Sequence, residues 1–66
     1  MNIIVNGDKM EVEENISIDQ LIDFLGIRER TMATAVNMKI VKEWDWIGYT
    51  LNEDDKIEFL EFVGGG

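Results

Sequence analysis

The sequence predicts an α+β fold in which one mixed sheet packs on a single main helix. Segments rich in β-branched or alternating residues occur at both ends of the chain, and one stretch between them carries apolar residues at helical spacing. The 66 residues are 45% hydrophobic and 30% charged, a globular balance that allows one domain with a small core. We place that domain at residues 1–63 and expect residues 64–66 to form a flexible C-terminal tail.

A β-hairpin is predicted at the start of the chain. Residues 3–5 are β-branched, and Asn6-Gly7 follows them closely. This dipeptide favours a type I′ turn, because both central residues of that turn have positive φ. Residues 9–13 then alternate polar and apolar, which predicts a second strand with Met10 and Val12 on its buried face.

A short helix is predicted over residues 18–25. Ser17 can cap its start, and Gln20 three residues later completes a capping box. One apolar stripe follows the helical spacing and consists of Ile18, Leu21, Ile22 and Leu25. Gly26 suits the left-handed position that ends a helix, and Ile27 can make the apolar contact that accompanies such an ending.

Three further strands are predicted, over residues 32–37, 40–41 and 56–63. Residues 43–50 lack a clean period and predict an irregular or 3₁₀ connection at one end of the core. Its large aromatic residues are interpreted as a lid over the core rather than as a ligand platform: Trp44, Trp46 and Tyr49. Taken in order, these elements match the β-grasp fold.

The composition excludes several classes of function. There is no histidine and no cysteine, so most self-contained enzyme mechanisms lack their usual groups, and no metal site is expected. Fourteen acidic and six basic residues give a net charge of −8, which disfavours nucleic acid and anionic membranes and favours a basic protein partner. The spacing of the acidic turn at residues 53–55 does not match a calcium loop. No signal peptide or bilayer-spanning run is visible, so we expect a cytoplasmic protein.

Three glycines end the sequence, and they are the candidate site. Gly64, Gly65 and Gly66 have no side chain to bury and lose much backbone entropy on ordering. They could enter a narrow channel of another protein, where the α-carboxylate of Gly66 could attack an activated phosphate to form an acyl-adenylate. The alternative interpretation is a frayed terminus without a function.

The last predicted strand leads directly into these glycines. Ile57 and Phe59 fit the face that meets the helix, which leaves Leu60 and Phe62 on the far side of the sheet. Together with Glu58, they are our candidate docking residues for a partner. Scattered surface apolar residues are the ordinary alternative.

The sequence resembles the ThiS family of ubiquitin-like sulfur carriers over nearly its whole length. The residues that carry the resemblance are Met1 to Gly7, Leu21 and Leu25, Ala35-Val36-Asn37, Ile40-Val41-Lys42, Trp44, Leu51 to Ile57, and Val63 with the glycines. It departs from the family pattern after Val41, where Lys42 and Glu43 replace the frequent proline and arginine, and in having a third glycine.

The resemblance implies a carrier that is not itself an enzyme and binds no cofactor. A ThiF-like adenylating enzyme would use ATP and Mg²⁺ to activate the Gly66 carboxylate, and a sulfur donor protein would convert it to a thiocarboxylate. A ThiG-like thiazole synthase would then take the sulfur for the thiazole of thiamine. The alternatives are a carrier resembling the small subunit of molybdopterin synthase and a non-catalytic ubiquitin-like interaction module. We expect the free chain to be a monomer.

Overall fold

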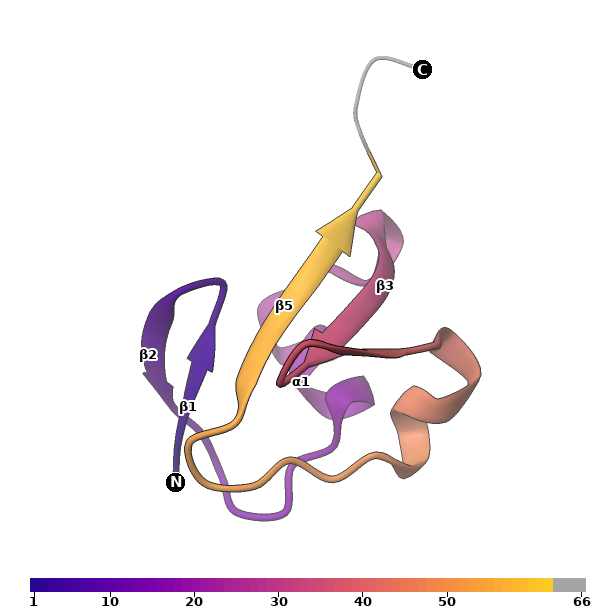
Figure 1. Cartoon of the computed structure of the whole chain (residues 1–66). Helices are drawn as coiled ribbons and strands as arrows, with labels where there is room; N and C mark the ends of the chain where they lie inside the picture. Colours follow the sequence, from indigo (N-terminus) through magenta and orange to yellow (C-terminus); the bar gives the residue numbers. More distant parts are fainter. Residues whose placement is uncertain (63–66) are drawn as a thin grey trace.

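The computed structural model describes residues 1–62, and in them a five-stranded mixed sheet packs on one α-helix (Figure 1). The elements are β1 (Asn2–Val5), β2 (Asp8–Glu11), α1 (Ile18–Leu25), the 3₁₀ helix η1 (Arg28–Arg30), β3 (Thr31–Val36), β4 (Lys39–Val41), the 3₁₀ helix η2 (Glu43–Gly48) and β5 (Lys56–Glu61). The strand order is β2-β1-β5-β3-β4, with β1 and β5 parallel and the other pairs antiparallel. This arrangement confirms the predicted α+β, β-grasp fold. Residues 63–66, which include the predicted tail, lie outside the described residues.

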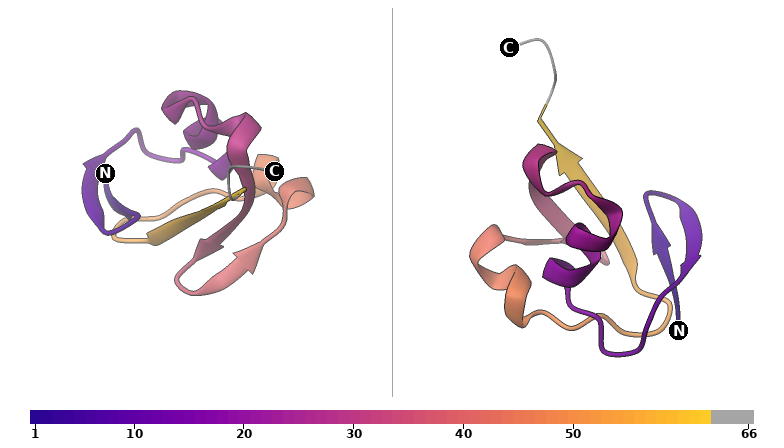
Figure 2. Two further views of the ribbon diagram at one scale, coloured as in Figure 1. Left: turned by 90° about the horizontal axis from the view of Figure 1, so that it is seen from above. Right: turned by 180° about the vertical axis from the view of Figure 1, so that it is seen from behind.

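The helix covers one face of the sheet. Seen from behind, α1 crosses in front of β3 and β5, whereas the face turned toward the viewer in Figure 1 carries no helix (Figure 2). No helix in the described part of the chain combines the length and the apolar character needed to cross a membrane. The uncovered face is called the outer face below.

The opening hairpin is formed as predicted. Asn6 and Gly7 have φ of 48° and 91°, which is the type I′ geometry that this dipeptide favours. Strand β2 begins at Asp8 and ends at Glu11, one residue earlier at its start and two residues earlier at its end than the predicted strand 9–13. Met10 and Val12 are half-buried at the margin of the core rather than fully buried, because β2 is an edge strand of the sheet.

Helix α1 has the predicted bounds, because both of its ends carry specific caps. The Ser17 hydroxyl oxygen accepts from the Gln20 N–H (3.1 Å), and the Gln20 side chain accepts from the Ser17 N–H (3.0 Å). Gly26 follows with φ of 68°, and the Ile27 N–H donates to the carbonyl oxygen five residues earlier (3.2 Å). These are the bonds of a Schellman ending.

The core lies between α1, the inner face of the sheet and η2. Its fully buried large side chains are Ile3, Ile18, Leu21, Ile22, Trp46, Leu51 and Ile57. Trp46 is the largest of them, and its indole N–H donates to the carbonyl oxygen of Val41 (2.9 Å). This bond satisfies the one polar group of the indole in an apolar environment.

The predicted aromatic lid is wrong for Trp44. Residues three apart share a side of a 3₁₀ helix, so Trp46 and Tyr49 face the core while Trp44 and Ile47 face away from it. Trp44 is 74% exposed, and its ring lies 5.4 Å from the Lys42 ammonium. Tyr49 is half-buried and packs against the core, as a lid residue would.

Candidate functional site

Strand β5 carries the chain toward the predicted tail and is held on both sides. It lies between β1 and β3, and its backbone pairs with β1 at its start and with β3 along most of its length. At its end, the Phe62 N–H donates to the carbonyl oxygen of Arg30 (2.9 Å), and the Arg30 guanidinium contacts the Glu61 carboxylate (2.8 Å). The described chain therefore ends at an anchored point, from which residues 63–66 begin.

Two asparagine side chains secure β5 at positions where backbone pairing stops. The Asn6 side-chain oxygen accepts from the Phe59 N–H (3.0 Å) just beyond the β1–β5 ladder. The Asn37 side-chain oxygen accepts from the Lys56 N–H (3.0 Å), and its amide donates to the Asp55 carboxylate (2.9 Å). Sequence reasoning placed Asn6 in the opening turn and Asn37 at the end of a predicted strand, and it predicted no bond from either side chain to β5. Their positive φ values of 48° and 51° are typical of turn residues, but the bonds to β5 depend on strands far away in sequence.

The side chains of β5 alternate between the two faces as predicted. Ile57 and Phe59 are 1% and 8% exposed and pack in the core. Leu60 and Phe62 are 43% and 61% exposed, and Glu58 is exposed as well. The structure thus makes these three residues accessible at the end of the described chain, while their docking role stays a prediction.

An apolar patch extends across the outer face from β5 to β4. Leu60 pairs with Ala33, and Ala35 pairs with Ile40, which is 57% exposed. Paired residues of adjacent strands point to the same face, so Ile40 and Leu60 lie on the face that α1 leaves open. We call Ile40, Leu60 and Phe62 the outer apolar patch.

The charges near this patch are mixed rather than strongly acidic. Ile4 pairs with Lys9 on one side and Lys56 on the other, so two basic residues share the outer face with Glu58. The exposed acidic residues are concentrated on other segments, such as the two helices α1 and η2, the β2–α1 connection and the turn before β5. The outer face therefore carries charges of both signs in a strongly acidic molecule.

The titratable groups at the end of β5 are the paired Arg30 and Glu61. Residues 1–62 hold no group of three or more acidic side chains arranged to hold a metal ion. The resolved pKa shift of a carboxyl group occurs elsewhere, at Asp23, where a hydrogen bond from the Arg28 guanidinium lowers the pKa. The candidate site predicted from the sequence is the three glycines and the strand that leads to them. Gly64, Gly65 and Gly66 themselves lie outside the described residues.

A comparison with protein families covers both the described domain and these glycines. The family model described as ThiS family matches residues 3–66. The chain belongs to the ThiS family. The resemblance seen in the sequence is thereby confirmed, and it extends through the terminal glycines.

Solved and curated proteins agree with this membership of the ThiS family. The crystal structure of a thiamine biosynthesis protein (ThiS) from Geobacter metallireducens superposes with a TM-score of 0.84 at 28% identity, over 100% of both chains. The sulfur carrier protein ThiS of Escherichia coli K12 is 26% identical over 66 residues, again covering 100% of both chains.

The chain is also similar to part of two longer proteins. A thiazole synthase of Paramagnetospirillum magneticum is 29% identical over 66 residues, and one of Magnetococcus marinus is 32% identical over the same length. This ThiS-family chain spans 20% of the length of each. A ThiS-like segment therefore occurs within proteins that are named for thiazole synthesis.

Proposed function

We propose that this chain is a sulfur carrier for thiazole formation in thiamine biosynthesis, with the Gly66 carboxylate as its reacting group. The observation that carries the proposal is the ThiS-family match, which runs from residue 3 through the terminal glycines. The chain acts as a co-substrate of its partner enzymes and not as a catalyst. It binds no cofactor of its own, and the adenylating partner uses ATP and Mg²⁺.

The proposed chemistry needs two steps at the Gly66 carboxylate, a nucleotidyl transfer at phosphorus and then an acyl transfer at the carbonyl carbon. A carboxylate oxygen of Gly66 attacks the α-phosphorus of ATP, pyrophosphate leaves, and the product is an acyl-adenylate. A hydrosulfide-type sulfur from the donor protein then attacks the carbonyl carbon, and AMP leaves to give the thiocarboxylate and a proton. Glycine at positions 65 and 66 keeps side chains away from the reacting carbon, and Gly64 serves as a spacer.

The outer apolar patch is the proposed docking surface for the ThiF-like adenylating enzyme. Leu60 and Phe62 are exposed on the strand that leads to the tail, and Glu58 lies on the same face. The bonds of Arg30 to the end of β5 keep this surface at a constant position relative to the start of the tail. A partner that binds the patch would thereby receive the glycines at a defined place.

Thiazole formation is favoured over the molybdopterin alternative by the relatives. Two of them are named thiazole synthases and contain a segment that the whole chain matches. A thiazole synthase of the ThiG type is therefore the proposed acceptor of the sulfur.

The experiment is intact-mass spectrometry of the chain after incubation with a ThiF-like adenylating enzyme, ATP, Mg²⁺ and sulfide. The expected gain equals the mass difference between one sulfur atom and one oxygen atom, and fragmentation should locate it at Gly66. Omission of ATP should abolish the gain.

Two matched variants sharpen this experiment. Deletion of Gly66 should abolish the mass gain and leave the urea unfolding curve unchanged, and one alanine added after Gly66 should also block activation. The positive control is the same adenylating enzyme with its own carrier protein in the same buffer. If that carrier gains the mass and this chain does not, the result would favour the non-catalytic interaction module instead.

A further inference from the structure

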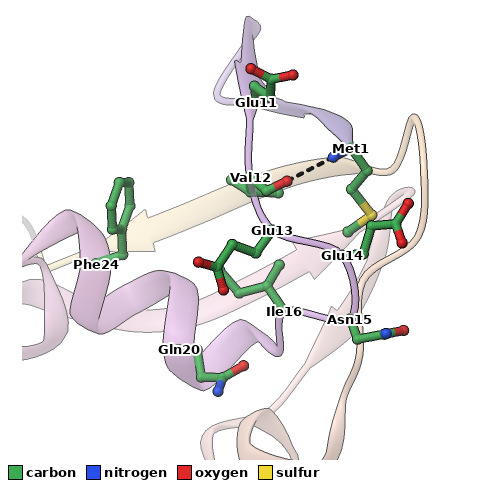
Figure 3. Close-up of a pocket in the computed structure, with 9 residues that line it drawn as sticks. All are labelled: Met1, Glu11, Val12, Glu13, Glu14, Asn15, Ile16, Gln20 and Phe24. Atoms are coloured by element: carbon green, nitrogen blue, oxygen red, sulfur yellow. Dashed lines mark hydrogen bonds between the residues drawn. The ribbon is translucent and has the colours of Figure 1, made fainter.

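A groove on the helix side of the molecule is not used by the proposed sulfur chemistry. It encloses about 650 Å³ between the β2–α1 connection and helix α1 (Figure 3). Val12, Ile16 and Phe24 supply apolar wall, and Glu13 extends into the space between Phe24 and the connection. Glu14 lies beside Met1 at the other end of the groove.

Phe24 is the large apolar residue of this groove whose exposed position is not required by packing of the core. It lies on α1 but outside the buried stripe of that helix, and 71% of it is exposed. An exposed phenylalanine contributes nothing to core packing, and a large aromatic side chain beside an open groove is a typical anchor for a bound segment. Val12 and Ile16 are half-buried, so they offer further apolar surface to the same occupant.

The groove is anionic along one side. Glu13 and Glu14 belong to its lining, and both are exposed. Its lining residues include no lysine or arginine. The ammonium of Met1, which donates to the carbonyl oxygen of Val12 (2.7 Å), is the one positive group among them, and the two carboxylates outnumber it. Charge complementarity therefore selects a cationic occupant, and the apolar wall selects one that also carries a large apolar side chain.

The groove and the outer apolar patch can be occupied at the same time. The groove lies against α1, and the patch lies on the opposite face of the sheet. Strands β1 and β5 are parallel, so Met1 lies at the end of the sheet where β5 begins, and Phe62 lies at the other end. A protein seated in the groove would leave the start of the tail uncovered.

We propose that this groove docks a basic segment of a second protein partner, with lysine or arginine on either side of one large apolar side chain. The apolar side chain packs against Phe24, and the cationic groups meet Glu13 and Glu14. This second surface would hold the carrier while another partner engages the outer apolar patch and the glycines.

The test begins with selection of peptides from a random library displayed on phage, with the whole chain as bait. Selected peptides should combine basic residues with an aromatic or aliphatic anchor. When the best of them is added to isotope-labelled chain, the NMR shifts should move at Val12, Ile16 and Phe24 and stay constant at Leu60. Binding should weaken as salt is added, because exposed charges are screened.

Matched variants separate the groove from general surface effects. Phe24→Ala should weaken binding of the selected peptide about tenfold or more, whereas Trp44→Ala, an equally exposed aromatic residue on η2, should leave it unchanged. The double variant Glu13→Gln with Glu14→Gln should weaken binding and flatten its salt dependence. Glu43→Gln on η2 is the matched charge control.

The proposal is overturned if the selected peptides lack basic residues or if the library yields no binder. It is also overturned if the NMR shifts that a selected peptide causes in the labelled chain map to the outer face. It is equally overturned if Phe24→Ala binds as tightly as the wild-type chain. These outcomes are independent of the sulfur chemistry, since Phe24→Ala should still gain the mass of a thiocarboxylate.

Discussion

At the residue scale, two buried threonines of β3 differ in whether the side-chain hydroxyl has a hydrogen-bond partner. The Thr31 hydroxyl donates to the carbonyl oxygen of Ile27 (2.8 Å). Thr34 is fully buried, and within residues 1–62 its hydroxyl oxygen has no hydrogen-bond partner. A buried polar group without a partner loses its hydration without compensation, which costs about 1–3 kcal/mol.

Replacement of Thr34 by valine should therefore raise the free energy of unfolding by about 1 kcal/mol, because the shape is kept and the unpaired hydroxyl is removed. Thr31→Val is the matched control and should lower it by about 1 kcal/mol, since a satisfied hydrogen bond is lost. Urea unfolding measures both changes. Destabilisation by Thr34→Val would mean that the hydroxyl is hydrated or bonded in solution.

At the element scale, helix α1 depends on its caps more than on its length. Eight residues are too few for an isolated helix to be stable in water. The capping box at Ser17, the Schellman ending at Gly26 and the buried stripe together compensate for the short length. The Arg28 guanidinium adds a surface contact by bridging Asp19 and Asp23 (2.8 Å to each).

Ser17→Ala should lower the free energy of unfolding by about 1 kcal/mol, because the Gln20 N–H loses its acceptor. Ser17→Asp keeps an acceptor and should stay close to wild type. Thermal unfolding followed by circular dichroism compares the two variants. An equal decrease in the free energy of unfolding in both variants would indicate that packing of the small serine side chain matters more than the capping hydrogen bond.

The Arg28 bridge predicts a pH effect. Its hydrogen bond holds the pKa of Asp23 below the ordinary value of 3.8, so the charged pair stabilises the fold above that pH. The contribution disappears as the pH falls through the lowered pKa of the folded state. NMR titration of the Asp23 carboxyl carbon should show a midpoint below 3.8 that rises toward it in Arg28→Gln. Arg30→Gln should leave it unchanged, since Arg30 contacts Glu61 instead.

At the scale of the whole molecule, the single helix divides the surface into two faces with different properties. The outer face carries the outer apolar patch beside the start of the tail, and the helix side carries an acidic groove. A carrier must be handed between partners, and two separate surfaces would permit one contact to form before the other is released.

Leu60→Ser and Phe62→Ser should each weaken binding to the adenylating enzyme about tenfold or more, because both residues are exposed apolar side chains at the proposed contact. Their urea unfolding midpoints should stay close to wild type. Trp44→Ser, on η2 and 74% exposed, is the control and should bind normally. Isothermal titration calorimetry measures the affinities, and normal binding by both variants would place the docking surface elsewhere.

Much of the fold could be predicted because its signals are local. Asn6-Gly7 requires a tight turn, and Ser17, Gln20 and Gly26 define both ends of α1 within a few residues of chain. The alternation in β5 separated its buried from its exposed residues for the same reason. Trp44 was misplaced because the sequence has no clean period between residues 43 and 50, and only contact with the core distinguishes the two sides of η2.

The amino-acid sequence by itself determined the five strands, helix α1 and their order, the facing of β5 and the glycines that the proposed chemistry uses. These features depend on propensities and periods within short segments. Only the tertiary structure decided that β1 pairs with β5, that Asn6 and Asn37 bind its backbone, and that Phe24 borders an acidic groove. Each of these relations joins residues distant in sequence, and no local pattern encodes which distant segments become neighbours.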